Sequence, residues 1–327
     1  MPEAPRFRHF YLGKNSFSKR HHCLPHRILL FPFALSTFAL EQTAVNTKNM
    51  QTPFVIFNGT LIPEHEAKLS VNDLAIVRGY GIFDYLKTIN GCPVFLEDNL
   101  DRFYRSAELM DLPVSYTRKQ LKEYIDTMMQ ANNIPDSGIK LLLTGGYSPD
   151  GYSIAEPNLI ISQHPITVTA EQQGIKLLPL DYHRPFSQVK SIDYVMGIQG
   201  LKIAKEKGAN DVLYIQNGQI SECPRANFFL ISAEGKLLTA ADDVLPGITR
   251  MKILELAKEK MEVEVRDITL EDLKNANEAF ISSTTKNITP VSSVLGYKDF
   301  GPEAGTQTRQ LQQLLEDLVS KTVNQYA

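Results

Sequence analysis

The chain has 327 residues, of which 43% are hydrophobic and 22% charged, and its formal net charge is -3. This composition indicates a soluble globular protein and excludes a disordered chain or a nucleic-acid-binding protein. Three cysteines, Cys23, Cys92 and Cys223, are too few for a disulfide framework and fit a reducing compartment. From the cysteines we expect a cytoplasmic protein. We expect no metal site, since no spacing typical of metal ligands is present.

Residues 1–49 differ from the remainder of the chain. A basic stretch up to His22 precedes an apolar run, Ile28–Leu40, that is too short to span a bilayer comfortably. A signal or transit peptide is one reading, but no small-residue cleavage site follows the run. Our hypothesis is that translation begins at Met50 and that this extension is disordered or absent from the native protein. We expect no membrane partner.

The first folded region is predicted to be a small α/β domain over residues 50–165. A strand from Phe54 leads into a turn at Asn58-Gly59 and a second strand. Apolar residues at helical spacing predict a helix from Leu96 to Leu112. Thr117 and Gln120 have capping-box spacing at the start of a second helix, which runs to Asn132. Two further strands, residues 139–146 and 158–166, complete the domain before a linker at residues 166–173.

Residues 174–327 are predicted to form a larger domain whose central stretch is Ser187–Ile231. Lys190 stands where a helical pattern begins, and that pattern ends at Gly208. A strand, a hairpin turn at Asn217-Gly218 and a return strand carrying Glu222 follow. Lysine forms Schiff bases with carbonyl compounds, and burial lowers its pKa toward the reactive neutral amine. A lone lysine is most often a solvated surface group. The indication of an active site therefore comes from the order of lysine, helix, hairpin and glutamate along the chain.

This order resembles the class IV, or fold-type IV, pyridoxal-phosphate aminotransferases. The family pattern of a Schiff-base lysine, a helix ending near glycine and a hairpin with glutamate and asparagine is met by Lys190, Gly208, Glu222 and Asn227. The similarity extends from Phe54 to the C-terminus. It implies a mixed α/β fold of two α/β domains with pyridoxal 5'-phosphate at their interface. It also implies a homodimer whose sites are completed by the neighbouring subunit.

The resemblance assigns the catalytic roles. Lys190 would bind the cofactor covalently and move the α-proton as general base and acid. Glu222 would pair with the pyridine nitrogen and keep it protonated, so that the ring accepts electrons. Tyr194 would reach the phenolic oxygen of the cofactor, although it lies one residue nearer to the lysine than in branched-chain enzymes.

The phosphate contacts are assigned in the same way. Arg102 lies in a stretch that meets most of a family motif, and a guanidinium matches phosphate oxygens in a bidentate manner. The alternative is that Arg102 pairs on the surface with Asp98. Gly247 precedes a helix start that would bind the phosphate, or would merely cap the helix. By resemblance the remaining cofactor contacts are Leu245 on the pyridine ring and Ile248, Thr249 and Thr284 on the phosphate, while Asn287 replaces an acid that is common in the family.

The residues at the positions expected to bind the substrate differ from those of the relatives. The paired arginine and histidine of D-amino acid transaminases are absent, and Lys140 stands nearest the place of the arginine of branched-chain enzymes. Arg78 and Arg225 appear where relatives carry other residues. We hypothesise that these two arginines bind the α-carboxylate, with one also meeting a side-chain carboxylate. The alternative is that both arginines are structural.

The predicted activity is transfer of an amino group between an amino acid and a 2-oxo acid such as 2-oxoglutarate. The charged substrate contacts narrowly favour a D-amino acid transaminase. A branched-chain L-amino acid aminotransferase is the first alternative, and an aminodeoxychorismate lyase or a non-catalytic cofactor-binding module are weaker ones.

Overall fold

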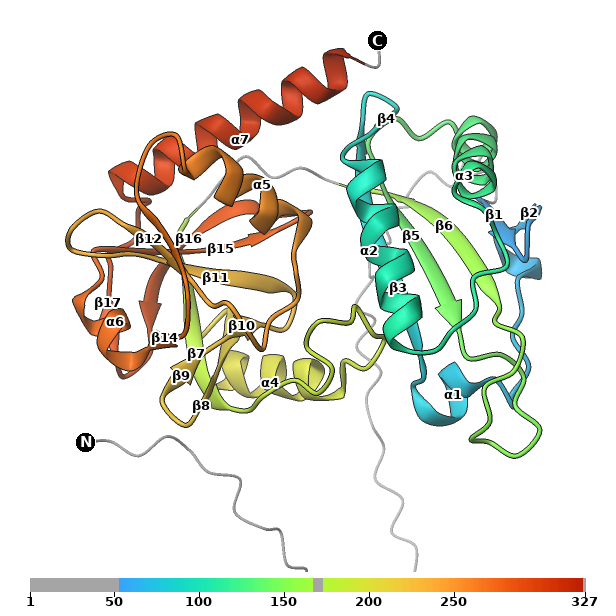
Figure 1. Ribbon diagram of the computed structural model, residues 1–327, viewed down its shortest axis with the longest axis horizontal. Coiled ribbons are helices and arrows are strands. Elements are labelled where there is room, and N and C mark those ends of the chain that lie inside the picture. The colour runs from blue at the N-terminus through green and yellow to red at the C-terminus, as the bar shows by residue number, and fades with distance from the viewer. Residues whose placement is uncertain (1–52, 167–172, 326–327) are drawn as a thin grey trace, which may run out of the picture. The chain divides into compact units, whose positions relative to one another are not determined.

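The computed structural model describes residues 53–166 and 173–325, which form two β-sheets with their helices (Figure 1). The N-terminal extension and most of the proposed linker lie outside the described residues, and the domain boundaries stay a prediction. Within the described ranges, no helix combines the length and the apolar character that crossing a membrane requires.

The first sheet has six antiparallel strands in the order β2-β1-β6-β5-β3-β4. The predicted turn at Asn58-Gly59 joins the first two strands with φ angles of 48° and 82°, which a two-residue hairpin requires. The strand bounds are β1 Phe54–Phe57, β2 Thr60–Pro63, β3 Gly81–Ile89, β4 Cys92–Pro93, β5 Ser137–Thr144 and β6 Leu159–Pro165.

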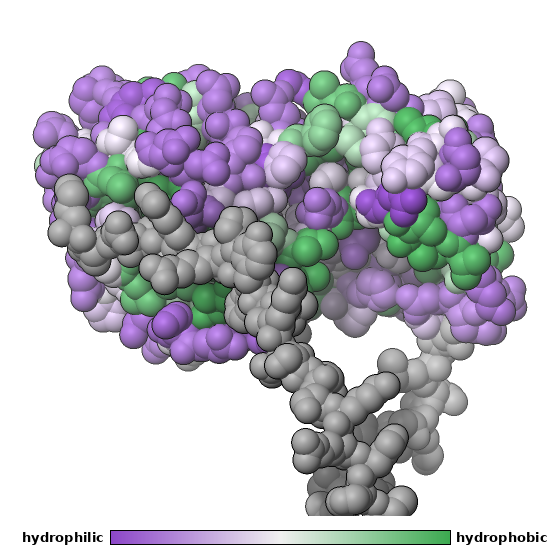
Figure 2. Space-filling view, turned by 90° about the horizontal axis from the view of Figure 1, so that it is seen from below, coloured by the Kyte–Doolittle hydropathy of each residue, from purple (hydrophilic) through white to green (hydrophobic). Residues whose placement is uncertain are grey.

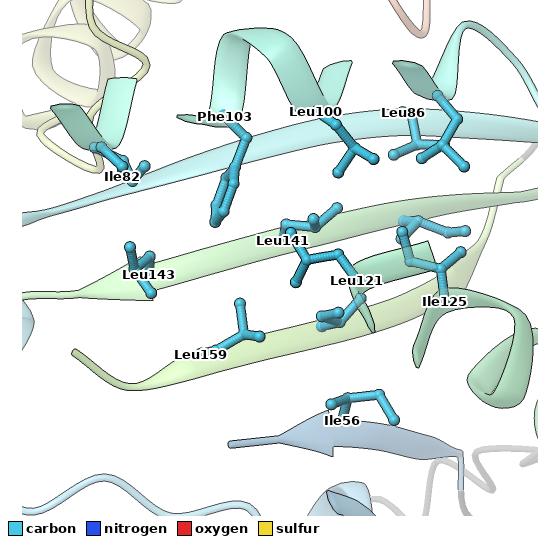
Figure 3. Close-up of a cluster of buried hydrophobic side chains, with 14 of the residues drawn as sticks. Ile56, Ile82, Leu86, Leu100, Phe103, Leu121, Ile125, Leu141, Leu143 and Leu159 are labelled. Atoms are coloured by element: carbon cyan, nitrogen blue, oxygen red, sulfur yellow. The ribbon is translucent and has the colours of Figure 1, made fainter. Parts of the chain in front are cut away.

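Two helices, α2 (Leu96–Leu109) and α3 (Arg118–Asn132), bury their apolar faces against this sheet. The predicted capping box of Thr117 and Gln120 is present at the start of α3. Figure 3 shows side chains from both helices meeting side chains from β3, β5 and β6. Burial of each large aliphatic or aromatic side chain contributes about 1.5–3 kcal/mol, so this core fixes α2 on the sheet. The fully buried side chains include Ile82, Leu86, Leu100, Phe103, Leu121 and Leu141.

A short helix, α1 (Leu74–Arg78), and a 3-10 turn, η1 (Glu64–Glu66), complete this part. The start of α1 is anchored by Asp73, which is fully buried. Its carboxylate accepts hydrogen bonds from Ala75 N at 2.8 Å, Thr144 Oγ1 at 2.8 Å and Asn158 Nδ2 at 2.9 Å. These donors offset the cost of removing the charge from water. Asp73 therefore ties α1 to the ends of β5 and β6.

The second sheet has eleven strands, of which nine follow the order β13-β12-β11-β15-β16-β7-β8-β9-β14. The pairs β7–β8, β7–β16 and β12–β13 are parallel. Helix α4 (Val195–Glu206) lies between the parallel strands β7 and β8 along the chain, as a crossover connection requires. The strand bounds are β7 Ile175–Asp181, β8 Asp211–Gln216, β9 Gln219–Ile220, β10 Glu222–Cys223, β11 Ala226–Ile231, β12 Leu237–Thr239, β13 Val263–Val265, β14 Ile268–Thr269, β15 Glu278–Ser283, β16 Asn287–Val294 and β17 Lys298–Asp299.

Four helices accompany this sheet: α4 Val195–Glu206, α5 Ile248–Ala257, α6 Leu270–Asn275 and α7 Thr306–Asn324. Helices α5 and α7 pack over Phe229 and Phe280, whose rings stack with centroids 4.7 Å apart. The helix that the sequence predicts from Lys190 onward is α4, and it begins five residues later, at Val195. The expected mixed α/β fold is confirmed.

The segment that carries Lys190 joins the two sheets. Phe83 N donates to Lys190 O at 2.9 Å, and Ile192 N donates to Gly81 O at 3.1 Å. A Cβ at Gly81 would lie 2.8 Å from the carbonyl oxygen of Leu143 on β5 and 3.2 Å from the Ile192 side chain, so glycine lets β3 pack closely against both neighbours. The two hydrogen bonds hold the backbone around Lys190 against the first residues of β3.

We predict that Gly146→Ala destabilises the protein more than Gly296→Ala. Both glycines have positive φ angles, 77° and 80°, so each alanine adds roughly 1–2 kcal/mol of strain. At Gly146 the new Cβ would also lie 2.2 Å from the carbonyl oxygen of Glu156, whereas at Gly296 it meets nothing within 4 Å. Urea unfolding should give a loss of roughly 2–4 kcal/mol for the first variant. Equal losses would contradict the packing argument.

Candidate active site

Two adjoining cavities open between the sheets, and residues from both sheets line them. We call them the polar cavity, which contains Glu222 and Thr249, and the wide cavity, which has a volume of about 650 Å³ and contains Tyr85 and Leu142. Lys190 lines both. Of the residues singled out from the sequence, the polar cavity is lined by Arg102, Lys190, Tyr194, Glu222, Arg225, Asn227, Leu245, Gly247, Ile248, Thr249 and Thr284.

Lys190 lies in the segment before α4, with its amino group 4.5 Å from the centroid of the Phe83 ring. Burial lowers the pKa of this amine to about 7, and the positive charge of Arg102 acts in the same direction. At neutral pH a substantial fraction of the side chain is therefore the uncharged amine, which is the nucleophilic form. The nearby carboxylate of Asp84 opposes this shift.

Glu222 at the start of β10 is 3% exposed, and both of its oxygens accept hydrogen bonds. Arg184 Nε donates to Oε1 at 3.0 Å, and the backbone N–H of Leu245 donates to Oε2 at 2.9 Å. Asn227 Nδ2 adds a contact to Oε2 at 3.3 Å. Burial raises the pKa of Glu222, while Arg184 pulls it down. The carboxylate is thus fixed in orientation at the wall of the polar cavity.

Arg184 is a site residue that the sequence reasoning missed. Besides its contact with Glu222, it donates to the carbonyl oxygens of Val189, at 2.8 Å, and Ser187. One guanidinium therefore connects Glu222 to the chain immediately before Lys190. In the sequence it is only a charged residue six positions before the lysine. No pattern in the neighbouring residues indicates where its side chain lies.

Arg102 on α2 is buried and lines the polar cavity. Its Nε and Nη2 donate to Asp84 at 2.9 and 2.8 Å, and Nη2 also approaches Asn99 Oδ1 at 3.4 Å. The proposed surface pair with Asp98 is wrong, because Asp98 binds Lys252 on α5 at 3.0 Å. Within the described chain Nη1 of Arg102 makes no hydrogen bond, so this edge is available to an anion.

Helix α5 begins at the cavity wall. Gly247 is its N-cap residue and provides no capping side chain, so the first N–H groups of the helix lack that partner. A Cβ on Gly247 would lie 2.1 Å from Asn227 Oδ1, so glycine is required there. Asn227 Nδ2 also donates to Leu245 O at 2.8 Å, which fixes the loop before the helix. This arrangement favours an anion site over a helix start that is merely capped.

The end of β15 contributes hydroxyl groups. Ser282 Oγ is buried, lines the polar cavity and has no hydrogen-bond partner among the residues that the structure describes. Ser283 and Thr284 follow it along the wall. Buried hydroxyls are normally paired, so this orphaned atom indicates that a ligand supplies the partner. Together with Arg102 and the open helix start, these groups fit the phosphate of pyridoxal phosphate.

The wide cavity combines cationic, phenolic and apolar side chains. Lys140 on β5 stands directly opposite Tyr85 on β3, and both line this cavity. The sequence analysis singled out Lys140 but not Tyr85, because the pairing of these two strands is not visible in the sequence. Gly138 gives the phenol room, because a Cβ there would lie 1.7 Å from Tyr85 Oη. Phe83, Leu142 and Ile192 supply the apolar surface.

The structure does not bring the two predicted arginines together within one chain. Arg225 follows β10 and lines both cavities. Arg78 ends α1, donates to the carbonyl oxygen of Val77 at 2.8 Å and lies over the Tyr152 ring at 4.5 Å from its centroid. It is exposed and lines neither cavity. The shared carboxylate clamp therefore stays a prediction.

We predict that the amine of Lys190 in the protein stripped of cofactor titrates near pH 7. Below that pH the group is charged and unreactive, and above it the neutral amine is available, because burial lowers its pKa to about 7. Acylation at several pH values, quantified by peptide mass spectrometry, should show half-maximal labelling of Lys190 near neutrality. Lys119, whose side chain is 86% exposed, provides the reference for the reagent. Labelling of Lys190 only above pH 9 would contradict the burial argument.

Comparison with known proteins agrees with this geometry. The family model described as amino-transferase class IV matches residues 81–294, from the start of β3 to the end of β16. The D-alanine aminotransferase of Bacillus licheniformis is 26% identical over 274 residues, which cover 81% of this chain and 96% of that protein. A D-alanine aminotransferase of Listeria monocytogenes is 28% identical over 280 residues, covering 82% and 96%.

Among solved structures, the branched-chain amino acid aminotransferase of Escherichia coli superposes with a TM-score of 0.75 at 27% identity. The match covers 82% of this chain and 95% of that one. The similarity thus includes the strands and helices that form both cavities. The chain belongs to the class IV aminotransferase family, whose members depend on pyridoxal phosphate.

Proposed function

We propose that this aminotransferase binds pyridoxal phosphate in the polar cavity and its amino acid and 2-oxo acid substrates in the wide cavity. The observation that carries the proposal is that Lys190, with a pKa lowered to about 7, lines both cavities. The bound cofactor supplies a ring that accepts electrons when the Cα–H bond of the substrate breaks.

Lys190 is proposed to hold the cofactor covalently and to carry the α-proton as general base and acid, which a pKa near the working pH favours. Glu222 is proposed to face the pyridine nitrogen. Arg184 donates to that carboxylate and opposes the rise in its pKa that burial causes, which favours the ionised form that can stabilise a proton on the ring. Tyr194 lines both cavities beside Lys190 and remains the candidate for the phenolic oxygen.

The phosphate is proposed to lie against Arg102 and the first residues of α5. Asp84 holds the guanidinium in place, and the backbone N–H groups of Ile248 and Thr249 lie at the open helix start. The hydroxyl of Thr284 completes the set. Leu245, whose backbone binds Glu222, is proposed to pack on the pyridine ring.

For the substrate, we propose a D-amino acid and a 2-oxo acid with a second carboxylate, such as 2-oxoglutarate. Arg225 would bind the α-carboxylate, and Lys140 with Tyr85 would meet the distal one. Relatives named D-alanine aminotransferase support the choice. The apolar surface formed by Phe83 and Leu142 favours a second candidate, a branched-chain L-amino acid aminotransferase.

We further propose a cytoplasmic homodimer. Val71, Ile76 and Val77, which precede Arg78, are 81%, 56% and 36% exposed. Figure 2 views the side on which α1 and α4 lie and shows apolar side chains in patches there. Covering such a surface with a second copy would remove it from water. Cys92 and Cys223 are free and buried, which suits a reducing compartment.

The first experiment follows the absorbance of the bound cofactor as single amino acids are added without a 2-oxo acid. We expect D-glutamate and D-alanine to convert the cofactor to its amine form and L-leucine and L-glutamate to leave it unchanged. Conversion by the L-amino acids alone would replace the proposal with the branched-chain activity. Release of pyruvate from aminodeoxychorismate without any amino acceptor would instead indicate the lyase.

A second prediction concerns Lys140→Met. Loss of the ammonium should raise the KM for 2-oxoglutarate about 10-fold, equivalent to about 1.4 kcal/mol, because one charge-assisted hydrogen bond to the distal carboxylate disappears. The KM for pyruvate, which has no distal carboxylate, should stay unchanged. Lys176→Met, on the exposed side of β7, is the control for loss of one positive charge. An equal effect on both 2-oxo acids would exclude a role of Lys140 in selecting dicarboxylates.

A further inference from the structure

Lys87 on β3 is a buried lysine that the proposed function does not use. Lys87 is 6% exposed, and burial lowers the pKa of its amine to about 8. Among the described residues it has no acidic partner. Its Nζ donates one hydrogen bond, to Asn287 Oδ1 at 2.5 Å. Burying an ammonium group without a carboxylate is costly, so the contact with Asn287 calls for an explanation.

Asn287 is the residue at which β16 begins, and it faces Ser283 across the hairpin from β15. Its φ angle is 50°, in the left-handed region that asparagine tolerates better than most residues. Between the two strands lies the turn that starts at Thr284. Lys286 N donates to Ser283 Oγ at 3.2 Å, which closes this turn locally. A bond to Asn287 therefore holds the base of the turn that carries Thr284.

A small cavity lies beside this contact and shares a wall with the polar cavity. Ile248, Thr249 and Thr284 line both cavities, with Lys87 and Asn287 on the far side of that wall. The other polar side chain that lines it, Asn99, is neutral, and Asn99 also contacts Arg102 at 3.4 Å. Lys87 thus stands behind the side chains proposed to bind the phosphate, without reaching the polar cavity itself.

We propose that Lys87 is a positioning residue for the phosphate site. Its hydrogen bond to Asn287 links strand β3 of the first sheet to the β15–β16 turn of the second, and so holds Thr284 against the start of α5. This inference rests on the proposed placement of the phosphate. Nothing in it requires Lys87 to touch the cofactor or the substrate.

Another contact across this boundary, between two helices, differs in kind. Lys252 on α5 binds Asp98 on α2 at 3.0 Å, and their side chains are 17% and 28% exposed. That ion pair connects two helices and leaves the turn of Thr284 untouched. Lys252→Met is therefore a matched control, because it removes a lysine and a contact between the same two parts without affecting Asn287.

The test compares the affinity of the protein stripped of cofactor for pyridoxal phosphate and for pyridoxal, which lacks the phosphate. Lys87→Met should weaken binding of pyridoxal phosphate about 10-fold, as expected for loss of one hydrogen bond to a charged group. Pyridoxal should bind as in the wild type, because Lys190 and Glu222 are unchanged. Lys252→Met should weaken binding of pyridoxal phosphate less than Lys87→Met does, because the ion pair that it removes leaves the turn of Thr284 in place.

Variants at Asn287 make the test specific. Asn287→Gly removes the acceptor without backbone strain at positive φ and should weaken pyridoxal phosphate binding as much as Lys87→Met. The double variant should be no worse than either single one, because both remove the same bond. Asn287→Asp keeps an acceptor and should retain the wild-type affinity.

Equal weakening of both ligands by Lys87→Met would overturn the proposal, since a purely structural role predicts that result. Additive losses in the double variant would also overturn it. A wild-type protein that binds both ligands equally would instead refute the phosphate site itself, which separates failure of the proposed function from failure of the role given to Lys87.

Discussion

Burial of the Lys190 amine is the constraint on which the site depends. Hydrogen bonds between the lysine segment and the first residues of β3 hold that amine between the two sheets. Removal from water lowers its pKa to about 7, and the guanidinium of Arg102 adds to the effect. A lysine in solvent would be almost wholly protonated at neutral pH. The reactivity proposed for Lys190 thus follows from how the sheets meet.

The cations around that amine are oriented by carboxylates from other elements. Asp84 on β3 holds Arg102 on α2, and Glu222 on β10 binds Arg184 in the chain before the lysine. Each pair is largely buried, so its geometry is fixed by several hydrogen bonds and not by charge alone. The polar groups of the site are therefore in place in the protein alone, and a ligand that fits them has little ordering left to do.

Local sequence signals predicted much of this structure. The capping box at Thr117, the turn at Asn217-Gly218 and the helix after Gly247 depend on residues close together in the chain, and each is present. The order of lysine, helix and hairpin predicted the family, which the comparisons confirm. What escaped prediction depends on pairing between distant strands. Tyr85 opposes Lys140, and Lys87 meets Asn287, 200 residues further along the chain. No local pattern encodes such contacts.

Strand β3 carries much of the site on one alternating pattern. Phe83, Tyr85 and Lys87 share one face by the two-residue period of a strand, while Asp84 points the other way and holds Arg102. Substitutions at Phe83 or Tyr85 can therefore change the shape of the wide cavity without disturbing Arg102. Insertion or deletion of a single residue in β3 would reverse both faces at once. Changes within β3 that alter substrate choice must therefore be substitutions that keep the length of the strand constant.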